Sequence, residues 1–266
     1  MSRIKTTFDR LKAEQRTALV TFVMAGDPTM ESALSVLKTL PESGADIIEV
    51  GMPFTDPAAD GLTIQHAGQR ALKSGATLSL TIDMVKEFRS GDDNTPIILM
   101  GYANPLYAYG LEKFAIAAKD AGVDGLIIVD LPPEESGELE QFTIKNGLDM
   151  IRLITPTTDE HRLETVLKGA SGFLYYVSIT GVTGTATADT DSIEKHIDLI
   201  KSKSDLPIAI GFGIKTPKDA QEMSRLGDAV VVGSAIVEKV SKVKENGAGM
   251  EDVQVFVRSL SEGLAA

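Results

Sequence analysis

Short apolar runs alternate with amphipathic stretches along the whole chain. The runs are rich in β-branched residues and too continuously apolar for strands with one wet face, which predicts parallel strands buried on both sides. Between them, as in residues 31–40, 111–121 and 192–203, apolar positions recur three and four apart, the spacing of helices with one buried face. The eight predicted strands lie within residues 18–26, 43–51, 96–103, 121–130, 146–154, 173–180, 207–214 and 226–233.

The order of these elements indicates an α/β fold. Strands that alternate with helices form either an open doubly wound sheet or a closed (β/α)₈ barrel, the TIM barrel. Eight strands in 266 residues favour the barrel, and no linker divides the chain, so we expect one domain over residues 1–266. Residues 3–15 predict an extra N-terminal helix that caps the bottom of the barrel. Residues 62–73 predict an extra helix after the second strand, before the helix of residues 77–88.

One phrase recurs before several predicted strands. It consists of a helical stretch, a glycine, often an aspartate, and then the apolar run, as in "SGADIIEVG", "AGVDGLIIVD", "NGLDMIRLI" and "LGDAVVVG". Glycine adopts the left-handed conformation that commonly ends a helix, so the phrase indicates a repeated helix-to-strand connection.

Charge and composition exclude several classes of function. The 26 Lys and Arg against 38 Asp and Glu leave a net charge of −12, without a basic block or Trp, which argues against nucleic-acid binding. No apolar run approaches the ~18 residues of a membrane span. The N-terminal residues mix charges throughout, unlike a signal peptide or anchor. The absence of Cys excludes disulfides and thiolate chemistry and fits a reducing compartment, so we expect a cytoplasmic protein.

Two carboxylates follow the second strand, in "IEVGMPFTDPAADG" (residues 48–61). Side chains alternate along a strand, so Ile48 and Val50 are expected to face the helices and Glu49 the barrel interior, near its mouth. Burial disfavours the charged carboxylate, so Glu49 could hold and transfer a proton near neutral pH. With Asp60 on the proline-restricted loop, this predicts a two-carboxylate proton-transfer site at the C-terminal face. The alternatives are a structural ion pair for Glu49 and a helix cap for Asp60.

Glycines also end the last three predicted strands, within residues 181–184, 211–214 and 231–237. In barrels the loops after the seventh and eighth strands commonly hold a phosphate, and glycine lets main-chain N–H groups approach it. Ser234 is expected to cap the following helix and donate its hydroxyl. Such a cradle needs no cation, which reconciles an acidic chain with an anionic ligand. The long polar connection at 180–191 predicts either a lid over the site or a disordered connector.

Aromatic residues suggest a flat apolar pocket. Phe22, Tyr175 and Phe212 lie on strands and either line the mouth of the barrel, where they would hold an aromatic ligand, or belong to the core. Three of the five tyrosines gather within residues 101–110, on a predicted loop, which indicates a protein contact or packing over the barrel's helices. The three histidines lack metal-ligand spacing, so we expect no metal site.

With these features in place, the chain resembles the α subunits of tryptophan synthase. The segment at 48–61 looks like the one around that family's two catalytic acids, and it and "GVTG" are the most specific matches. The resemblance extends in family order over almost the whole chain, through "GDPT" (26–29), "YANPLY" (102–107), "DLPPEE" (130–135), "YYVSITGVTG" (175–184), "GFGIKTP" (211–217) and "GSAIV" (233–237).

The resemblance implies a lyase of tryptophan biosynthesis that cleaves indole-3-glycerol phosphate to indole and glyceraldehyde 3-phosphate by a retro-aldol reaction. It implies that Glu49 is the general acid/base and that Asp60 accepts a hydrogen bond from the indole N–H and stabilises charge on the ring. The implied indole pocket comprises Phe22, Ile127, Tyr175, Thr183 and Phe212, and the implied phosphate site Gly184, Gly213, Gly233 and Ser234.

The resemblance also implies a partner. It implies no cofactor on this chain, because pyridoxal phosphate belongs to the β subunit, and it implies an α₂β₂ heterotetramer. The β subunit would dock over residues 53–60, 102–109 and 131–135.

Three positions depart from the family pattern. Leu62 stands where the family often has Pro, Val129 where Pro or Ala is common, and no Arg follows Gly184 where many members carry one. The alternative functions are a lyase that releases free indole, a non-catalytic phosphate-binding barrel that activates a partner, and a sugar-phosphate isomerase or epimerase. An epimerase would need metal ligands or another base on other strands, and none is evident.

Overall fold

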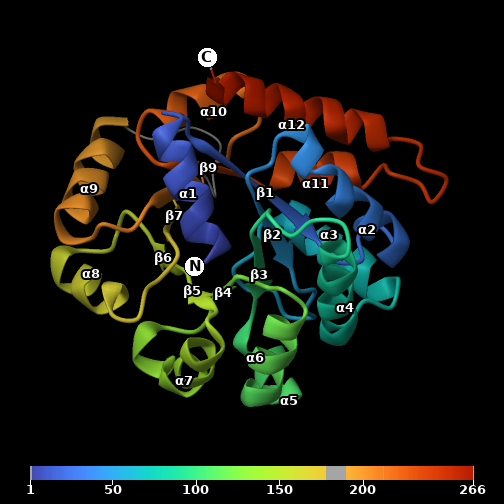
Figure 1. Ribbon diagram of the computed structural model, residues 1–266, viewed down its shortest axis with the longest axis horizontal. Helices are drawn as coiled ribbons and strands as arrows, with labels where there is room; N and C mark the ends of the chain where they lie inside the picture. The colour runs from blue at the N-terminus through green and yellow to red at the C-terminus, as the bar shows by residue number, and fades with distance from the viewer. Residues whose placement is uncertain (1, 178–189, 212, 266) are drawn as a thin grey trace.

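The chain folds as a (β/α)₈ barrel, as predicted, with parallel strands inside a ring of helices (Figure 1). The structure, a computed structural model, describes residues 2–177, 190–211 and 213–265. The strands are β1 (Ala18–Met24), β2 (Ile47–Gly51), β3 (Ile97–Gly101), β4 (Gly125–Ile128), β5 (Asp149–Met150), β6 (Arg152–Ile154), β7 (Leu174–Val177), β8 (Ile208–Gly211) and β9 (Ala229–Val232). The α-helices are α1 (Arg3–Ala13), α2 (Met30–Thr39), α3 (Leu62–Lys73), α4 (Leu78–Arg89), α5 (Ala103–Tyr109), α6 (Leu111–Asp120), α7 (Gly137–Asn146), α8 (Glu160–Leu167), α9 (Thr190–Lys203), α10 (Pro217–Ser224), α11 (Ser234–Val240) and α12 (Met250–Ala265). Two 3₁₀ turns, η1 (Pro41–Ser43) and η2 (Pro133–Glu135), complete the elements of the described ranges.

The barrel closes where the chain passes directly from β5 to β6. The order of the strands is β5-β4-β3-β2-β1-β9-β8-β7-β6, so the two ends of the sheet are neighbours in the chain. The prediction of one strand within residues 146–154 is therefore wrong in detail. β5 pairs only with β4 and β6 only with β7, and the ladder changes partner at Ile151, whose N–H donates to Leu126 O at 3.0 Å.

Alternation along the strands separates two apolar layers. Ile48 and Val50 are buried among the helices, whereas Ile47 packs with Ile98 and Val20 in the barrel interior. Glu49 is therefore on the interior side, as its alternation with Ile48 and Val50 predicts.

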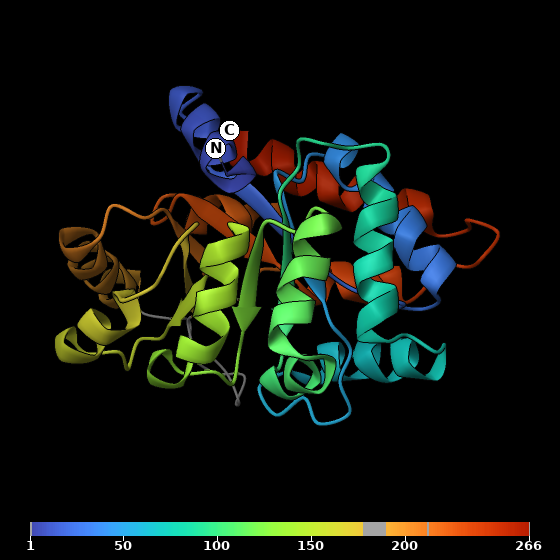
Figure 2. The ribbon, with the colours of Figure 1, turned by 60° about the horizontal axis from the view of Figure 1, so that its bottom comes forward.

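Both extra helices are present. α1 closes the N-terminal end of the barrel, where Ile4, Phe8 and Leu11 pack into the interior cluster. α3 and α4 both lie between β2 and β3, which accounts for the extra stretch after the second strand. In Figure 2, α1 lies at the opposite end of the barrel from the loop between β2 and α3. Within the described ranges, no helix combines the length and apolarity needed to cross a membrane.

The aspartates of the recurring Gly–Asp phrase bind the neighbouring strand. Each of three such residues at the N-terminal end of the barrel accepts the N–H at or near the start of an adjacent strand. The bonds join Leu19 N to Asp46 Oδ2 at 2.9 Å, Ile97 N to Asp124 Oδ2 at 2.9 Å, and Ile208 N to Asp228 Oδ2 at 2.8 Å. The repeated aspartate is therefore structural, because it satisfies main-chain donors where the ladder begins.

Candidate active site

A cavity of about 810 Å³ opens at the C-terminal ends of the strands. It is lined from β1, β2, β3, β7, β8 and β9, from residues that follow β2, β3, β4, β8 and β9, and from the start of α3. Seven of the eleven site residues proposed from the sequence line this cavity: Phe22, Glu49, Asp60, Tyr175, Gly213, Gly233 and Ser234. Thr183, Gly184 and Phe212 lie outside the described residues, as does most of the expected lid at 180–191.

Ile127 does not line the cavity. It is fully buried in the interior cluster, paired in register with Met100 of β3. Two residues further along the chain, Val129 does reach the cavity wall. The two side chains point to the same side of the chain, so Ile127 fills the layer beneath and Val129 occupies the place expected for it.

Glu49 is a buried acid without a partner. It lies in β2 opposite Phe22 of β1 and Ile98 of β3, and its exposed fraction is 1%. Neither carboxylate oxygen has a hydrogen-bond partner among the described residues. Burial raises the pKa of Glu49 from 4.5 to about 8, because the anion loses its hydration without gaining a compensating donor. Glu49 is therefore mainly protonated at neutral pH and can donate that proton.

Asp60 belongs to a small hydrogen-bonded network at the rim. The Tyr102 hydroxyl donates to Asp60 Oδ1 at 2.9 Å and accepts the Ala59 N–H at 3.0 Å, while Gln65 Nε2 donates to Asp60 O at 2.8 Å. Burial raises the pKa of Asp60, and the bond from Tyr102 opposes that shift. The N-cap of α3 is Gly61 and makes no side-chain cap, so Asp60 is not the helix cap that was its alternative.

Sequence reasoning missed Tyr102 as a site residue. The expected tyrosine-bearing loop is the short helix α5, preceded by Tyr102 as its N-cap. Tyr102 is 4% exposed and lines the cavity, whereas Tyr107 is exposed and Tyr109 packs edge-on against Phe114. The available signal was Tyr102's position directly after β3, at the end of the barrel where side chains meet a ligand.

Aromatic rings form one wall of the cavity. Phe22 passes over Gly51, where a Cβ would lie 2.6 Å from the ring, and the Tyr175 hydroxyl lies against Gly211. Burial, and secondarily the charge of Glu49, raise the pKa of Tyr175 well above its usual range. Tyr175 is therefore a neutral phenol beside Glu49, and any larger residue in place of either glycine would displace these rings.

Three of the four residues expected to bind phosphate, Gly213, Gly233 and Ser234, border this cavity. Gly213 has φ +39°, and no heavy atom of the described residues lies within 4 Å of where its Cβ would be. Gly233 and Ser234 line the same cavity. The expected helix cap is wrong, because Gly233 is the N-cap of α11, Ser234 is its first residue, and no side chain caps the helix. Lys215 also lines the cavity, and sequence reasoning did not single it out.

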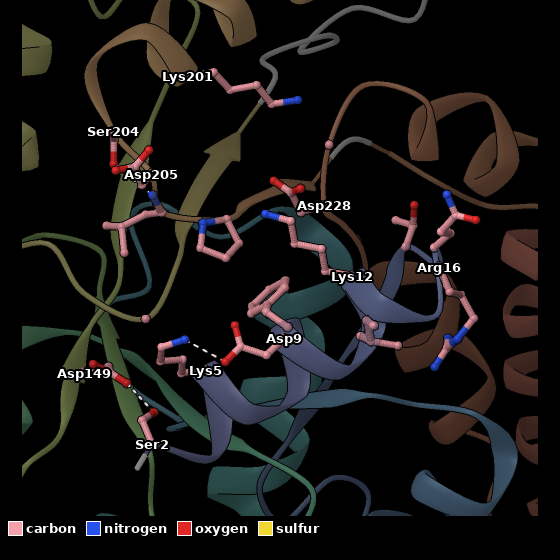
Figure 3. Close-up of a pocket in the computed structure, with 18 residues that line it drawn as sticks. Ser2, Lys5, Asp9, Lys12, Arg16, Asp149, Lys201, Ser204, Asp205 and Asp228 are labelled. Carbon is pink, nitrogen blue, oxygen red and sulfur yellow. Dashed lines mark hydrogen bonds and ion pairs between the residues drawn. The ribbon is translucent and has the colours of Figure 1, made fainter.

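A second cavity, of about 730 Å³, lies at the N-terminal end under α1 (Figure 3). Three of its four acids are already held: Asp9 pairs with Lys5 at 2.6 Å, Asp149 accepts from Ser2 Oγ at 2.8 Å, and Asp228 accepts the Ile208 N–H. The fourth, Asp205, is exposed to solvent. The C-terminal cavity, with an unpaired buried acid, is therefore the candidate active site. The described residues contain no group of three or more His, Asp or Glu that could hold a metal ion.

Comparison with known proteins places this arrangement in a family. Residues 8–265 match the model of the tryptophan synthase α chain. The chain is similar to tryptophan synthase subunit α from Legionella pneumophila str. Paris, with 37% identity, TM-score 0.92, and coverage of 100% of this chain and 99% of that one. A solved chain from Aquifex aeolicus VF5 gives 36% identity, TM-score 0.90 and 99% coverage of both chains. A chain of Mycobacterium tuberculosis tryptophan synthase gives 31% identity, TM-score 0.89, and coverage of 100% and 99%. The chain belongs to the tryptophan synthase α chain family, a family of lyase-type enzymes of tryptophan biosynthesis with the TIM-barrel fold.

Proposed function

We propose that the chain cleaves indole-3-glycerol phosphate to indole and glyceraldehyde 3-phosphate. The observation that carries the proposal is Glu49, a buried carboxyl with no partner among the described residues, which faces a cavity also lined by Asp60 and two aromatic rings. A group with a pKa of about 8 can give and take a proton at neutral pH, which is what a general acid/base requires.

Glu49 serves twice in the proposed reaction. Its protonated carboxyl first gives a proton to C3 of the indole ring, and the ring becomes cationic. The resulting carboxylate then removes the proton from the glycerol hydroxyl next to C3. The C–C bond breaks, its electron pair returns to the ring, and the hydroxyl carbon becomes the aldehyde. Glu49 ends protonated as it began, so the balance needs no oxidant, reductant or cofactor from this chain.

Asp60 acts on the other side of the ring in this proposal. It accepts a hydrogen bond from the indole N–H, and that bond strengthens as positive charge develops on the nitrogen. The network around Asp60 supports the role, because Tyr102 holds one carboxylate oxygen and leaves the other available. Phe22 and Tyr175, which line the cavity, would form the flat wall against which the ring packs. By the resemblance to the family, Thr183 and Phe212 would belong to the same pocket.

The phosphate lies at the glycine-lined part of the cavity in this proposal. Main-chain N–H groups at Gly184, Gly213, Gly233 and Ser234 would bind its oxygens. The surroundings of Gly213 support this position, since no side chain of the described residues lies within 4 Å of where its Cβ would be. The absence of Cys fits our proposal of a cytoplasmic protein.

We further propose that the chain works with a β subunit in an α₂β₂ heterotetramer, with pyridoxal phosphate held by the β subunit. The docking face would comprise residues 53–60, 102–109 and 131–135. Exposed Leu62 and Tyr107 beside the cavity mouth support a contact at this end, since large apolar side chains there gain from being covered.

The test is an assay of the purified chain with indole-3-glycerol phosphate, measuring indole and glyceraldehyde 3-phosphate with and without a β subunit. We expect equal amounts of both products, faster turnover with the β subunit, and a loss of about 10²-fold or more in Asp60→Asn, because one charge-stabilising group is removed. A chain that forms neither product in either condition contradicts the proposal. Activation of a β subunit without cleavage would instead support the non-catalytic alternative.

A further inference from the structure

The active-site cavity has one cation in its described wall. The charged residues that line it are Glu49, Asp60, Lys215 and Glu238. Three of these four are acids, of which Glu49 is mainly protonated at neutral pH, and the whole chain carries a net charge of −12. The negative charges repel a dianionic phosphate that enters the cavity. Among the described residues of the wall, Lys215 is the one whose charge attracts the phosphate.

The main chain fixes the base of Lys215. Its N–H and that of Thr216 both donate to Asp219 Oδ2, at 3.0 and 2.9 Å. Thr216 and Asp219 form a complete capping box at the start of α10. The loop from β8 to α10 is therefore held at the position of Lys215, and the side chain alone remains adjustable.

The Lys215 side chain can reach an anion above Gly213. The two residues are two positions apart, so their Cα atoms are separated by at most about 7 Å, and the four-carbon side chain spans a comparable length. Lys215 is exposed, and among the described residues its ammonium forms no ion pair. Its nearby counterpart Lys218 is 82% exposed, pairs with Glu222 at 3.8 Å and does not line the cavity.

We propose that Lys215 binds the phosphate of the substrate and supplies charge that the glycine cradle lacks. The proposal rests on the function proposed above and assigns a specificity-determining residue to that site. Lys215 acts on binding and takes no part in proton transfer, because it lies at the phosphate end of the cavity, two residues beyond Gly213. Glu238 lines the same cavity and opposes the attraction, so its removal has the opposite sign.

The experiment is a titration of the whole chain with inorganic phosphate, followed by calorimetry or by ³¹P NMR. We expect Lys215→Gln to weaken phosphate binding about tenfold, the usual size of one lost charge-assisted hydrogen bond. Lys215→Arg retains most of the affinity, and Glu238→Gln strengthens it. The matched control is Lys218→Gln, which removes a lysine of the same region from outside the cavity and leaves binding unchanged.

Kinetics with indole-3-glycerol phosphate separate binding from chemistry. Lys215→Gln is expected to raise KM about tenfold with kcat within about twofold, the pattern of an interaction made equally in ground and transition states. A Lys215→Gln variant that binds phosphate as tightly as the unaltered chain overturns the proposal, and so does an unaltered chain that does not bind phosphate. If the unaltered chain binds phosphate but does not cleave the substrate, the proposed reaction fails while the titration still decides the role of Lys215.

Discussion

The two ends of the barrel bury acids in opposite ways. At the N-terminal end, the buried residues Asp46 and Asp124 each accept a main-chain N–H and pair with arginines. At the C-terminal end, Glu49 is as deeply buried as any of them and has no partner among the described residues. The same chemical group therefore stabilises the fold at one end and, in the proposed function, transfers a proton at the other.

Asp124 represents the paired end. Its carboxylate accepts from Arg89 Nη2 at 2.8 Å, from Arg3 Nη1 at 3.0 Å and from Ile97 N at 2.9 Å. The Arg89 side chain is only 8% exposed, so each charge compensates a partner that has also lost its hydration. A buried pair of this kind is costly to break because the remaining charge stays buried.

Glu49 represents the unpaired end. Its strand neighbours are Phe22 and Ile98, and no cation of the described residues compensates its charge. Burial therefore raises the pKa of Glu49. Acids in this condition cluster at functional sites, because a carboxyl that is protonated at neutral pH can act as an acid and then as a base. We therefore expect substitution of Glu49 to change activity and substitution of a paired acid at the N-terminal end to change stability.

The largest effect is expected for Glu49→Gln. The amide cannot transfer the proton, so cleavage of indole-3-glycerol phosphate should fall by about 10³-fold or more. Because no described partner is lost, the midpoint of thermal unfolding should stay the same or rise. Indole release and a melting curve on the same preparation measure both. A variant that retains activity, or that loses it only by unfolding, would remove the contrast between the two ends.

Asp124→Ala should show the reverse pattern. It leaves Arg89 buried without its acid and should lower the free energy of unfolding by about 3–5 kcal/mol. Molecules that remain folded should cleave the substrate at the normal rate, since Asp124 lies at the other end of the barrel. Urea denaturation measures the stability. The matched control is Asp93→Ala, whose side chain is 85% exposed and contacts Arg3 only at 3.8 Å, and which should change little.

The pH dependence of stability should sharpen the comparison further. Between pH 4.5, where the unfolded chain ionises Glu49, and about 8, where the folded chain does, the folded state binds more protons. Raising the pH through this window therefore lowers the stability of the unaltered chain relative to Glu49→Gln, by up to about 1.4 kcal/mol per pH unit. Urea titrations of both proteins at several pH values measure the difference. If the free energy of unfolding changed with pH in the same way in both proteins, Glu49 would ionise normally in the folded protein.

The smallest effect is expected for Tyr102→Phe. It removes the hydroxyl that donates to Asp60 and accepts from Ala59, and should lower kcat/KM about tenfold. Because that bond lowers the pKa of Asp60, its loss should raise this pKa and shift the acid limb of the pH–rate profile upward. Tyr107→Phe is the matched control, since Tyr107 is exposed on the same helix segment. Equal losses in both variants would argue against a specific role for Tyr102.

The sequence predicted the direction of Glu49 but not the partner of Asp60, for a physical reason. Direction in a strand follows from alternation, which leaves a single choice once Ile48 and Val50 are buried. The bond between Tyr102 and Asp60 joins residues 42 apart and depends on the path of a loop, which no periodicity describes. Local pattern therefore locates the acid, and only the folded chain locates the network.

The same distinction explains the remaining errors. Ile127 and Val129 point to the same side of the chain, so pattern alone cannot decide which reaches the cavity and which fills the layer beneath. The break at Ile151 follows from barrel closure, in which β5 and β6 pair with different neighbours. The repeated aspartates were visible as a pattern, but their role required the register between strands.

The most direct test of the unpaired acid is the titration of Glu49 itself. A ¹³C NMR titration of carboxyl-labelled chain, with Glu49→Gln to assign the signal, reports its pKa in the folded protein. We expect Glu49 to ionise at about pH 8. Ionisation near the ordinary value of 4.5 would mean that a partner or water stabilises the anion, and would contradict the assignment of Glu49 as the proton carrier.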